Sequence, residues 1–277
     1  MNILGIDFEE WFHPQLIQKY LTNEKKELKI SNGLDKILDW LRKNNTIATF
    51  FVVGEIIYQK PEIFDKIKSH GHEIGFHTMY HNRLDEENYN KEKFQDEIKL
   101  FNKLTNNISK GFRAPTFSLN EKCSWVIDVL EEYEYVYDSS IVPVKTKMYG
   151  MDKAEKNPYI ISSKNLKQNN KNGQIKEFPL LVTKFMGKKI PAGGGFYLRT
   201  LPTKIIKNAI MKYEKENMPA TFYIHSWELT PEYMPKIRMS KTDSFITYHN
   251  LEKSMERMTQ ILKEFNFTSF SEYLKKN

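Results

Sequence analysis

The sequence predicts an α/β fold with a mainly parallel sheet, either open or closed into a barrel. Three observations support this prediction. Segments with strand character alternate with segments of helical periodicity along the whole chain. The stretch 47–53 is apolar on both faces, as parallel strands covered by helices usually are. Polar residues directly follow several strands, which is where such folds gather their functional groups.

The N-terminal half contains four candidate strands separated by helices. Residues 2–8 form an apolar run that leads into acids, which indicates a buried strand whose C-terminal end opens on a site. Apolar residues then recur at helical spacing after Gly33 and after Pro61. We therefore expect strands at 2–8, 47–53, 72–76 and 111–115, and helices at 33–43, from 61 to about 71, and at 91–104.

The C-terminal half continues the alternation around one polar insertion. Residues 145–175 are rich in Lys, Asn and Ser and indicate a surface excursion, and Gly193–Gly195 lies in a tight connection. We expect a helix through 125–130, a strand at 135–138, order again at 175–181, a helix from 202, a strand at 220–225, a helix at 251–264 and a last strand or turn at 267–270. Because the alternation persists to the end, we expect a single domain over 1–277.

The composition is that of a globular protein and argues against several other classes. The chain has 277 residues, of which 40% are hydrophobic and 28% charged, as in ordinary globular proteins. The net charge of +7 comes from lysines spread along the whole chain, so we read it as a solvated surface and expect no nucleic-acid partner. The one cysteine, Cys123, excludes an intramolecular disulfide. Residues 1–7 do not read as a signal peptide and no stretch reads as a membrane span, so we expect a cytoplasmic protein.

Residues 77–81 begin and end with histidine and suggest a metal centre. Two imidazoles four residues apart meet on one side if the backbone turns helically. Neutral imidazole is a common ligand of divalent transition metals, and a catalytic zinc usually takes three protein ligands. Asp7 and Glu9 point the same way on an extended strand, whereas Glu10 points the other way. The polar residues at or just past the expected strand ends are Asp7, His77, Arg113, Asp138 and His225.

These pieces, in this order, resemble the polysaccharide deacetylase family, also called the NodB-homology or carbohydrate esterase family 4. The matching motifs are Asp7-Phe8-Glu9-Glu10, His77–His81, Arg113-Ala114-Pro115 and Tyr223-Ile224-His225. A subgroup associated with bacterial exopolysaccharide loci is matched further by Tyr137–Ser140, Gly193–Tyr197 and His225–Glu228. The resemblance covers nearly the whole chain and implies a distorted (β/α)7 barrel.

The resemblance also implies a reaction, the removal of an N-acetyl group from an amino sugar in a polysaccharide or its precursor. One divalent ion, zinc or alternatively Co, Ni or Mn, is then held by Glu9, His77 and His81, where it activates water and polarises the carbonyl. Glu9 is preferred to Glu10 because it shares a side with Asp7; family members often have adjacent aspartates, whereas Phe8 follows Asp7 here. By resemblance, Asp7 is the general base, His225 the general acid, Arg113 orients Asp7, and Asp138 pairs with His225.

Other interpretations remain open at this point. The same ligands would serve a metal-dependent hydrolase of a non-sugar amide or imide, and a non-catalytic carbohydrate-binding relative would keep the fold. His225 could also be a satisfied core histidine and Arg113 a structural ion-pair partner. The aromatic residues Trp11, Phe12, Tyr197 and Trp227 are candidates for stacking on sugar faces, although core packing is the default for most of them.

Overall fold

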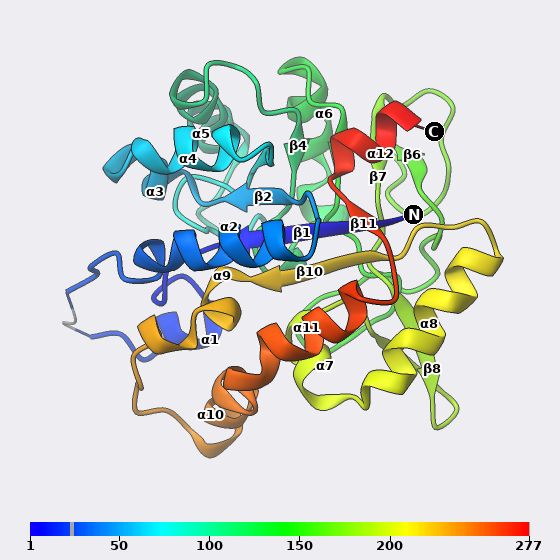
Figure 1. Cartoon of the computed structure of the whole chain (residues 1–277). Coiled ribbons are helices and arrows are strands. Elements are labelled where there is room, and N and C mark those ends of the chain that lie inside the picture. Colours follow the sequence, from blue (N-terminus) through cyan, green and yellow to red (C-terminus); the bar gives the residue numbers. More distant parts are fainter. Residues whose placement is uncertain (23–24, 277) are drawn as a thin grey trace.

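A curled sheet of parallel strands forms the centre of the molecule, whose computed structural model describes residues 1–22 and 25–276 (Figure 1). The strands follow the order β10 (Thr221–His225), β1 (Asn2–Phe8), β2 (Thr49–Val52), β3 (Glu73–Phe76), β4 (Gly111–Phe112), β5 (Tyr137–Asp138) and β7 (Ile175–Glu177). β6 (Tyr159–Ile161) pairs antiparallel with β7, β11 (Phe267–Thr268) pairs with β1, and β8 (Val182–Phe185) and β9 (Lys188–Pro191) form a separate hairpin. The predicted α/β class and distorted seven-stranded barrel are confirmed.

The chain after β7 spans the gap between β7 and β10. Leu180 forms an isolated parallel bridge with Thr221, and Gly194 forms another with Tyr223. Gly194 has a φ of 128°, and a Cβ atom there would lie 1.6 Å from the carbonyl oxygen of Tyr223. Only glycine allows this close approach of two backbones. The tight connection expected at these glycines is therefore part of the barrel wall.

Helices surround the sheet, most of them on its outer face. They are α1 (Gln15–Gln18), α2 (Leu34–Lys43), α3 (Gly54–Gln59), α4 (Glu62–Ser69), α5 (Lys91–Leu104), α6 (Trp125–Glu132), α7 (Gly195–Thr200), α8 (Thr203–Lys215), α9 (Ser226–Leu229), α10 (Lys241–Tyr248), α11 (Ser254–Leu262) and α12 (Phe270–Lys276). Short 3-10 turns lie at Ile30–Gly33, Pro115–Phe117, Glu121–Cys123, Pro231–Tyr233 and Leu251–Lys253. No helix in the described residues is both long and apolar enough to cross a membrane.

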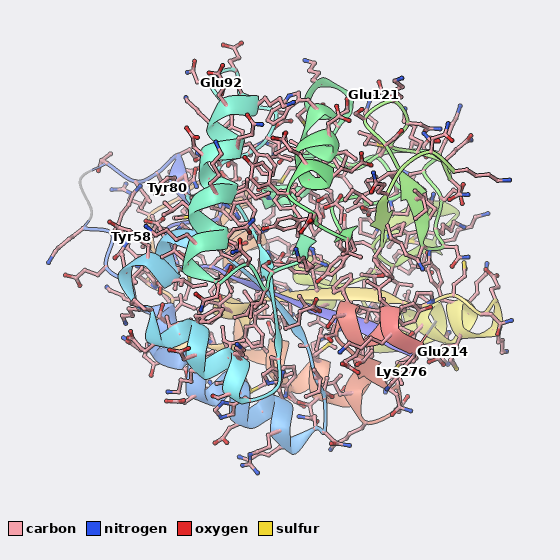
Figure 2. The ribbon with its side chains drawn as sticks, turned by 90° about the horizontal axis from the view of Figure 1, so that it is seen from above. Tyr58, Tyr80, Glu92, Glu121, Glu214 and Lys276 are labelled. Atoms are coloured by element: carbon pink, nitrogen blue, oxygen red, sulfur yellow. The ribbon has the colours of Figure 1, made fainter. Side chains whose placement is uncertain are left out.

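Apolar side chains fill both sides of the sheet. The outer core lies between the strands and the helices, where α2 buries Ile37, Leu38 and Leu41. Figure 2 shows the side chains of Glu92 and Glu121 at the outer edge of the molecule. Inside the barrel, Phe270 of α12 stacks on Tyr137 with ring centroids 4.9 Å apart. The first turn of α12 also binds side chains at the starts of β2 and β3, so this helix plugs the N-terminal end of the barrel. The opposite end of the barrel, where the parallel strands have their C-terminal ends, carries the polar residues.

Strand register brings the polar strand ends together. Asp7 of β1 lies directly opposite His225 of β10, and Phe76, which precedes His77, is in register with Phe112, which precedes Arg113. In Figure 1 the arrowheads of β1, β2 and β10 point to the same end of the barrel, away from the N-terminus. The residues predicted to follow the strands therefore meet at one edge.

Candidate active site

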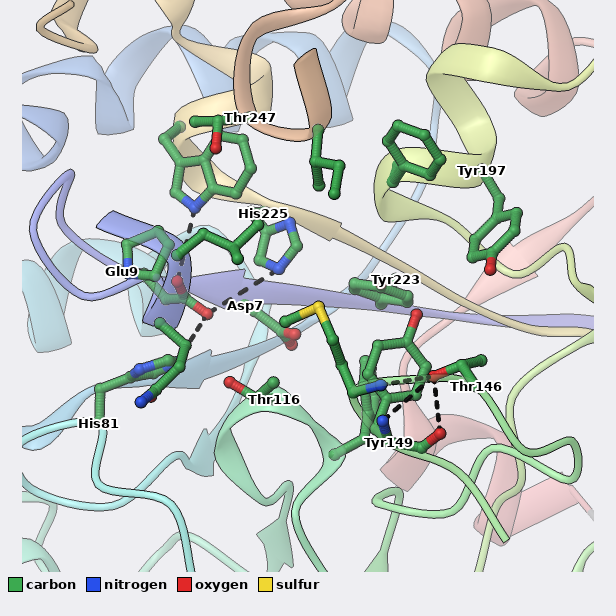
Figure 3. A pocket seen from close by; sticks show the side chains of 18 of the residues that line it. Asp7, Glu9, His81, Thr116, Thr146, Tyr149, Tyr197, Tyr223, His225 and Thr247 are labelled. Carbon is green, nitrogen blue, oxygen red and sulfur yellow. Dashed lines mark hydrogen bonds and ion pairs between the residues drawn. The ribbon is translucent and has the colours of Figure 1, made fainter. Parts of the chain in front are cut away.

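A carboxylate and two imidazoles converge at this edge. The ligand atoms of Glu9, His77 and His81 all lie within 4.8 Å of one another, and those of Asp7, Glu9 and His225 form a second such group. Oε1 of Glu9 is 3.1 Å from Nε2 of His81 and 3.4 Å from Nε2 of His77. Figure 3 shows Asp7, Glu9, His81 and His225 at one end of a pocket. The structure thus brings five of the seven predicted site residues into one cluster.

The loop between the two histidines is not the helical turn that their spacing suggested. Thr78 and His81 both adopt left-handed backbone conformations, with φ of 56° and 57°, and the two imidazole centroids still come within 5.1 Å. The carbonyl groups of Thr78 and Met79 accept hydrogen bonds from the N–H groups of Gly54 and Glu55 at the start of α3. These bonds hold a backbone geometry that is costly for residues other than glycine.

The cluster has the chemistry of a divalent metal centre. His77 donates from Nδ1 to the carbonyl oxygen of Arg113 at 2.6 Å, so its Nε2 carries the lone pair. That nitrogen is buried and has no hydrogen-bond partner among the described residues. Burial alone would raise the pKa of Glu9, but the imidazoles of His81 and His225 hold it well below its usual range. Two imidazole nitrogens and one carboxylate are a donor set that fits a borderline ion such as Zn²⁺.

Glu10 makes structural hydrogen bonds away from the histidines. Its carboxylate accepts hydrogen bonds from the backbone N–H groups of Lys29, Ile30 and Ser31 at 2.8–2.9 Å, and from the Ser31 hydroxyl at 2.6 Å. Four donors thus occupy both oxygens and anchor the segment before α2. Glu9, in contrast, faces the histidines, so of the two acids it is the one beside the imidazoles.

Arg113 forms a buried ion pair with Asp7. Its Nη1 is 2.7 Å from Oδ1 of Asp7, while Nε and Nη2 donate to the carbonyl and the hydroxyl of Ser139 at 2.9 Å. The guanidinium also lies over the ring of Phe51, and none of the Arg113 side chain is exposed. All three nitrogens of the guanidinium are therefore engaged, and Nη1 holds one oxygen of Asp7.

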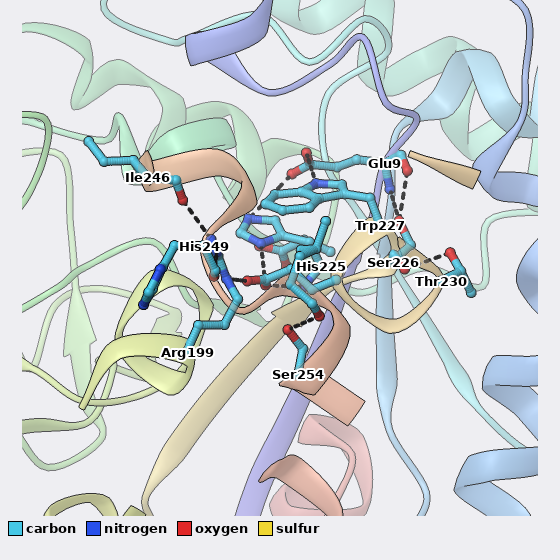
Figure 4. Close-up of polar contacts among 12 residues, drawn as sticks. Glu9, Arg199, His225, Ser226, Trp227, Thr230, Ile246, His249 and Ser254 are labelled. Carbon is cyan, nitrogen blue, oxygen red and sulfur yellow. Dashed lines mark hydrogen bonds and ion pairs between the residues drawn. The ribbon is translucent and has the colours of Figure 1, made fainter. Parts of the chain in front are cut away.

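The acidic partner of His225 is Glu228, three residues later on α9. Nδ1 of His225 is 2.7 Å from Oε2 of Glu228, whose other oxygen accepts from Nε of Arg199 at 2.7 Å (Figure 4). Burial by itself lowers the pKa of His225, but the carboxylates of Glu228 and Glu9 raise it to about 9. Trp227 stacks on the imidazole with centroids 4.6 Å apart. His225 therefore points Nε2 towards Glu9.

The prediction that Asp138 pairs with His225 is wrong. Asp138 is fully buried and lies opposite Glu177 across β5 and β7, and its Oδ1 accepts a hydrogen bond from the Ser140 hydroxyl. Burial raises the pKa of both Asp138 and Glu177, and their mutual repulsion raises that of Glu177 further. The histidine's real partner was visible in the sequence as the spacing His225-x-x-Glu228.

A cavity of about 320 Å³ extends from the cluster along the barrel mouth. Figure 3 shows Tyr149 and Tyr197 at the end away from Glu9, with Tyr223 between them and His225. Trp227 also lines the cavity. Trp11 and Phe12 pack in the same buried cluster as Trp227, but they are not among the lining residues of the cavity in the described chain. Of the four aromatic residues considered for sugar stacking, Tyr197 and Trp227 therefore line the cavity in the described part of the chain.

Fold and site together define an α/β barrel with a candidate metal centre at its C-terminal mouth. Residues 19–137 match the family model described as polysaccharide deacetylase, and residues 139–275 match a model described as a domain of unknown function, DUF3473. The polysaccharide deacetylase model thus matches the stretch that carries His77, His81 and Arg113, and the curated relatives below are deacetylases by name.

The relatives match only part of the chain. A peptidoglycan-N-acetylglucosamine deacetylase of Bacillus cereus is 37% identical over 84 residues, which are 29% of this chain and 30% of that protein. The peptidoglycan-N-acetylmuramic acid deacetylase PdaA of Bacillus subtilis is 32% identical over 99 residues, 31% of this chain and 37% of that protein. The matched stretch thus spans about a third of each relative.

A solved structure matches almost the whole chain. The crystal structure of a putative polysaccharide deacetylase from Mycobacterium smegmatis aligns with a TM-score of 0.61 and 13% identity, covering 99% of this chain and 90% of that one. At this identity the likeness concerns the fold. The aligned fold covers both the segment that matches the polysaccharide deacetylase model and the segment 139–275.

Proposed function

We propose that the chain is a metal-dependent N-deacetylase that removes acetyl groups from an amino sugar in a polysaccharide or its precursor. The observation that carries this proposal is the buried trio of Glu9, His77 and His81, flanked by Asp7 on one strand and His225 on the next. Zinc is the first candidate ion, with Co, Ni and Mn as alternatives. We further propose one catalytic domain over 1–277, because strands from both matched segments build one sheet.

The residues around the trio suit amide hydrolysis. A divalent ion bound there would polarise the acetyl carbonyl and activate a water molecule. Arg113 occupies Oδ1 of Asp7, which leaves Oδ2 to take the proton from that water. Glu228 holds Nδ1 of His225, so Nε2 faces the cavity and delivers a proton to the departing amine. One acid and one base on neighbouring strands thus flank the reacting carbonyl.

The substrate class follows from the relatives and the cavity. Both curated relatives described above act, by name, on N-acetylated sugars of peptidoglycan. The cavity offers aromatic and hydroxyl-bearing side chains, such as Tyr149, Tyr197 and Trp227, which suit the faces and edges of sugar rings. Membership of the exopolysaccharide-locus subgroup and a cytoplasmic site of action are further proposals, which cell fractionation and an assay on precursor saccharides would test.

Acetate release provides the functional test. The purified protein, loaded with Zn²⁺, is incubated with N-acetylglucosamine oligomers, and acetate and free amines are measured alongside an Asp7→Asn variant. We expect acetate and amine in equal amounts from the wild type and a loss of at least about a hundredfold in the variant. A parallel assay uses small cyclic amides. Turnover of these amides without release of acetate from any saccharide would replace the proposal by the non-sugar hydrolase.

A further inference from the structure

Arg199 holds three groups from two parts of the barrel mouth. It lies on α7 and is only 2% exposed. Its Nε donates to Glu228 at 2.7 Å, its Nη1 to the carbonyl oxygen of His249 at 2.7 Å, and its Nη2 to the carbonyl oxygen of Ile246 at 2.8 Å (Figure 4). The first contact supports the partner of His225. The other two fix the end of α10, where Ile246 lines the cavity.

We propose that Arg199 is a positioning residue that couples the orientation of His225 to the segment 246–249, of which Ile246 and Thr247 form part of the cavity wall. The inference rests on the proposed function, because it assigns His225 the role of acid and the cavity the role of saccharide site. It adds a link between substrate binding and the proton donor. A saccharide that contacts this wall thereby affects the orientation of His225 through the Arg199 guanidinium.

The geometry explains why arginine is required at this position. The carbonyl groups in the last turn of a helix lack partners within the helix, and Arg199 supplies two donors at the end of α10. Asn250 follows in the left-handed conformation, and its side-chain amide donates to the carbonyl oxygen of Arg199 at 3.2 Å. A planar fork with five N–H groups reaches two carbonyls and a carboxylate at once, whereas a lysine ammonium is a single point.

Steady-state kinetics of three variants test the coupling. Glu228→Gln keeps both wall contacts of Arg199 and should lower kcat at least about tenfold, with KM changed less than about twofold. Arg199→Met should lower kcat similarly and also raise KM about 3- to 10-fold, because the wall loses its donors. Arg199→Lys retains one cation beside Glu228 and should recover part of kcat while KM stays high.

Arg257→Met is the matched control. Arg257 is a half-buried arginine that also donates to a backbone carbonyl, that of Leu201, and it does not line the cavity. The kcat and KM of Arg257→Met should stay within about twofold of the wild-type values. If folded Arg199→Met has wild-type kcat and KM, or changes only one of them, the coupling is refuted. If Arg199→Met does not fold, Arg199→Lys decides by the same criteria.

A second readout separates this inference from the proposed function. Amide hydrogen exchange reports on the segment 246–249, and the NMR signal of the Nδ1 ring proton of His225 reports on its bond to Glu228. Both should change in Arg199→Lys and neither in Arg257→Met. If the wild type releases no acetate, the proposed function fails, and these two signals alone decide the coupling. An unchanged His225 signal beside a loosened wall overturns it.

Discussion

Replacing Arg113 by methionine leaves the Asp7 carboxylate buried without its cation, and we expect it to lower the free energy of unfolding by about 3–5 kcal/mol. Asp7 is 2% exposed and Arg113 is fully buried, so neither charge can turn to water. The substitution also removes the donors to the carbonyl and hydroxyl of Ser139. Because the hydroxyl of Ser139 keeps its own bond to the Phe178 carbonyl, most of the loss comes from the unpaired carboxylate.

The size of this loss in the free energy of unfolding depends on the burial of the two charges, because an exposed ion pair contributes little. Lys99 and Asp96 form a pair at 3.4 Å on the exposed face of α5, with side chains more than half exposed. Such pairs contribute about 0–1 kcal/mol. Lys99→Met is therefore the matched control, and we expect it to change the free energy of unfolding by less than about 1 kcal/mol.

A double-mutant cycle measures the pair directly. Urea denaturation of metal-free protein at neutral pH gives the free energies of unfolding of Arg113→Met, Asp7→Asn and the double variant. Once Asp7 is neutral, loss of Arg113 should cost much less, so the double variant should lose at least about 2 kcal/mol less than the sum of the single losses. Additivity within about 0.5 kcal/mol would refute the reasoning that burial makes this pair strong.

Three further results are expected. His81→Ala should lose both bound metal, measured by mass spectrometry, and turnover, whereas the exposed His70→Ala should retain both. Asp7→Asn should keep one bound ion per chain while acetate release falls at least about a hundredfold; full activity would exclude Asp7 as the base. Glu177 and Asp138 have unfolded-state pKa values near 4.5 and 3.8, and both are raised in the folded protein, so their contribution to stability is present below about pH 4 and lost as the pH rises. The free energy of unfolding of Glu177→Gln, measured by urea titration, should therefore rise relative to that of the wild type between pH 4 and 7. A difference that does not change with pH would contradict the raised pKa values of the two buried carboxyl groups.

Part of the site was predictable because parallel strands end at one edge. Asp7, His77, Arg113 and His225 each follow a short apolar run, and that pattern alone predicted their neighbourhood. The pleat of β1 also predicted that Glu9 and Glu10 face opposite ways. The chemical roles of these residues were predicted from the family motifs, because polar residues at strand ends occur in many folds and do not specify a reaction.

Other features depend on contacts between residues far apart in the chain. No local pattern indicates that Thr78 and His81 turn left-handed, because the bonds that hold them come from α3. Asp138 ends a strand like the other candidates, but Glu177 on the neighbouring strand engages it. The contact between Arg199 and Glu228 joins α7 to α9, and the sequence gives no sign of it.

The central claim is that Glu9, His77 and His81 hold one divalent ion beside Asp7 and His225. Anomalous X-ray diffraction at the zinc edge, on crystals grown with one equivalent of Zn²⁺, tests it most directly. The account predicts one peak within bonding distance, about 2.0–2.2 Å, of Oε1 or Oε2 of Glu9 and a nitrogen of each histidine. A peak elsewhere, or none at this trio at full zinc loading, would contradict it.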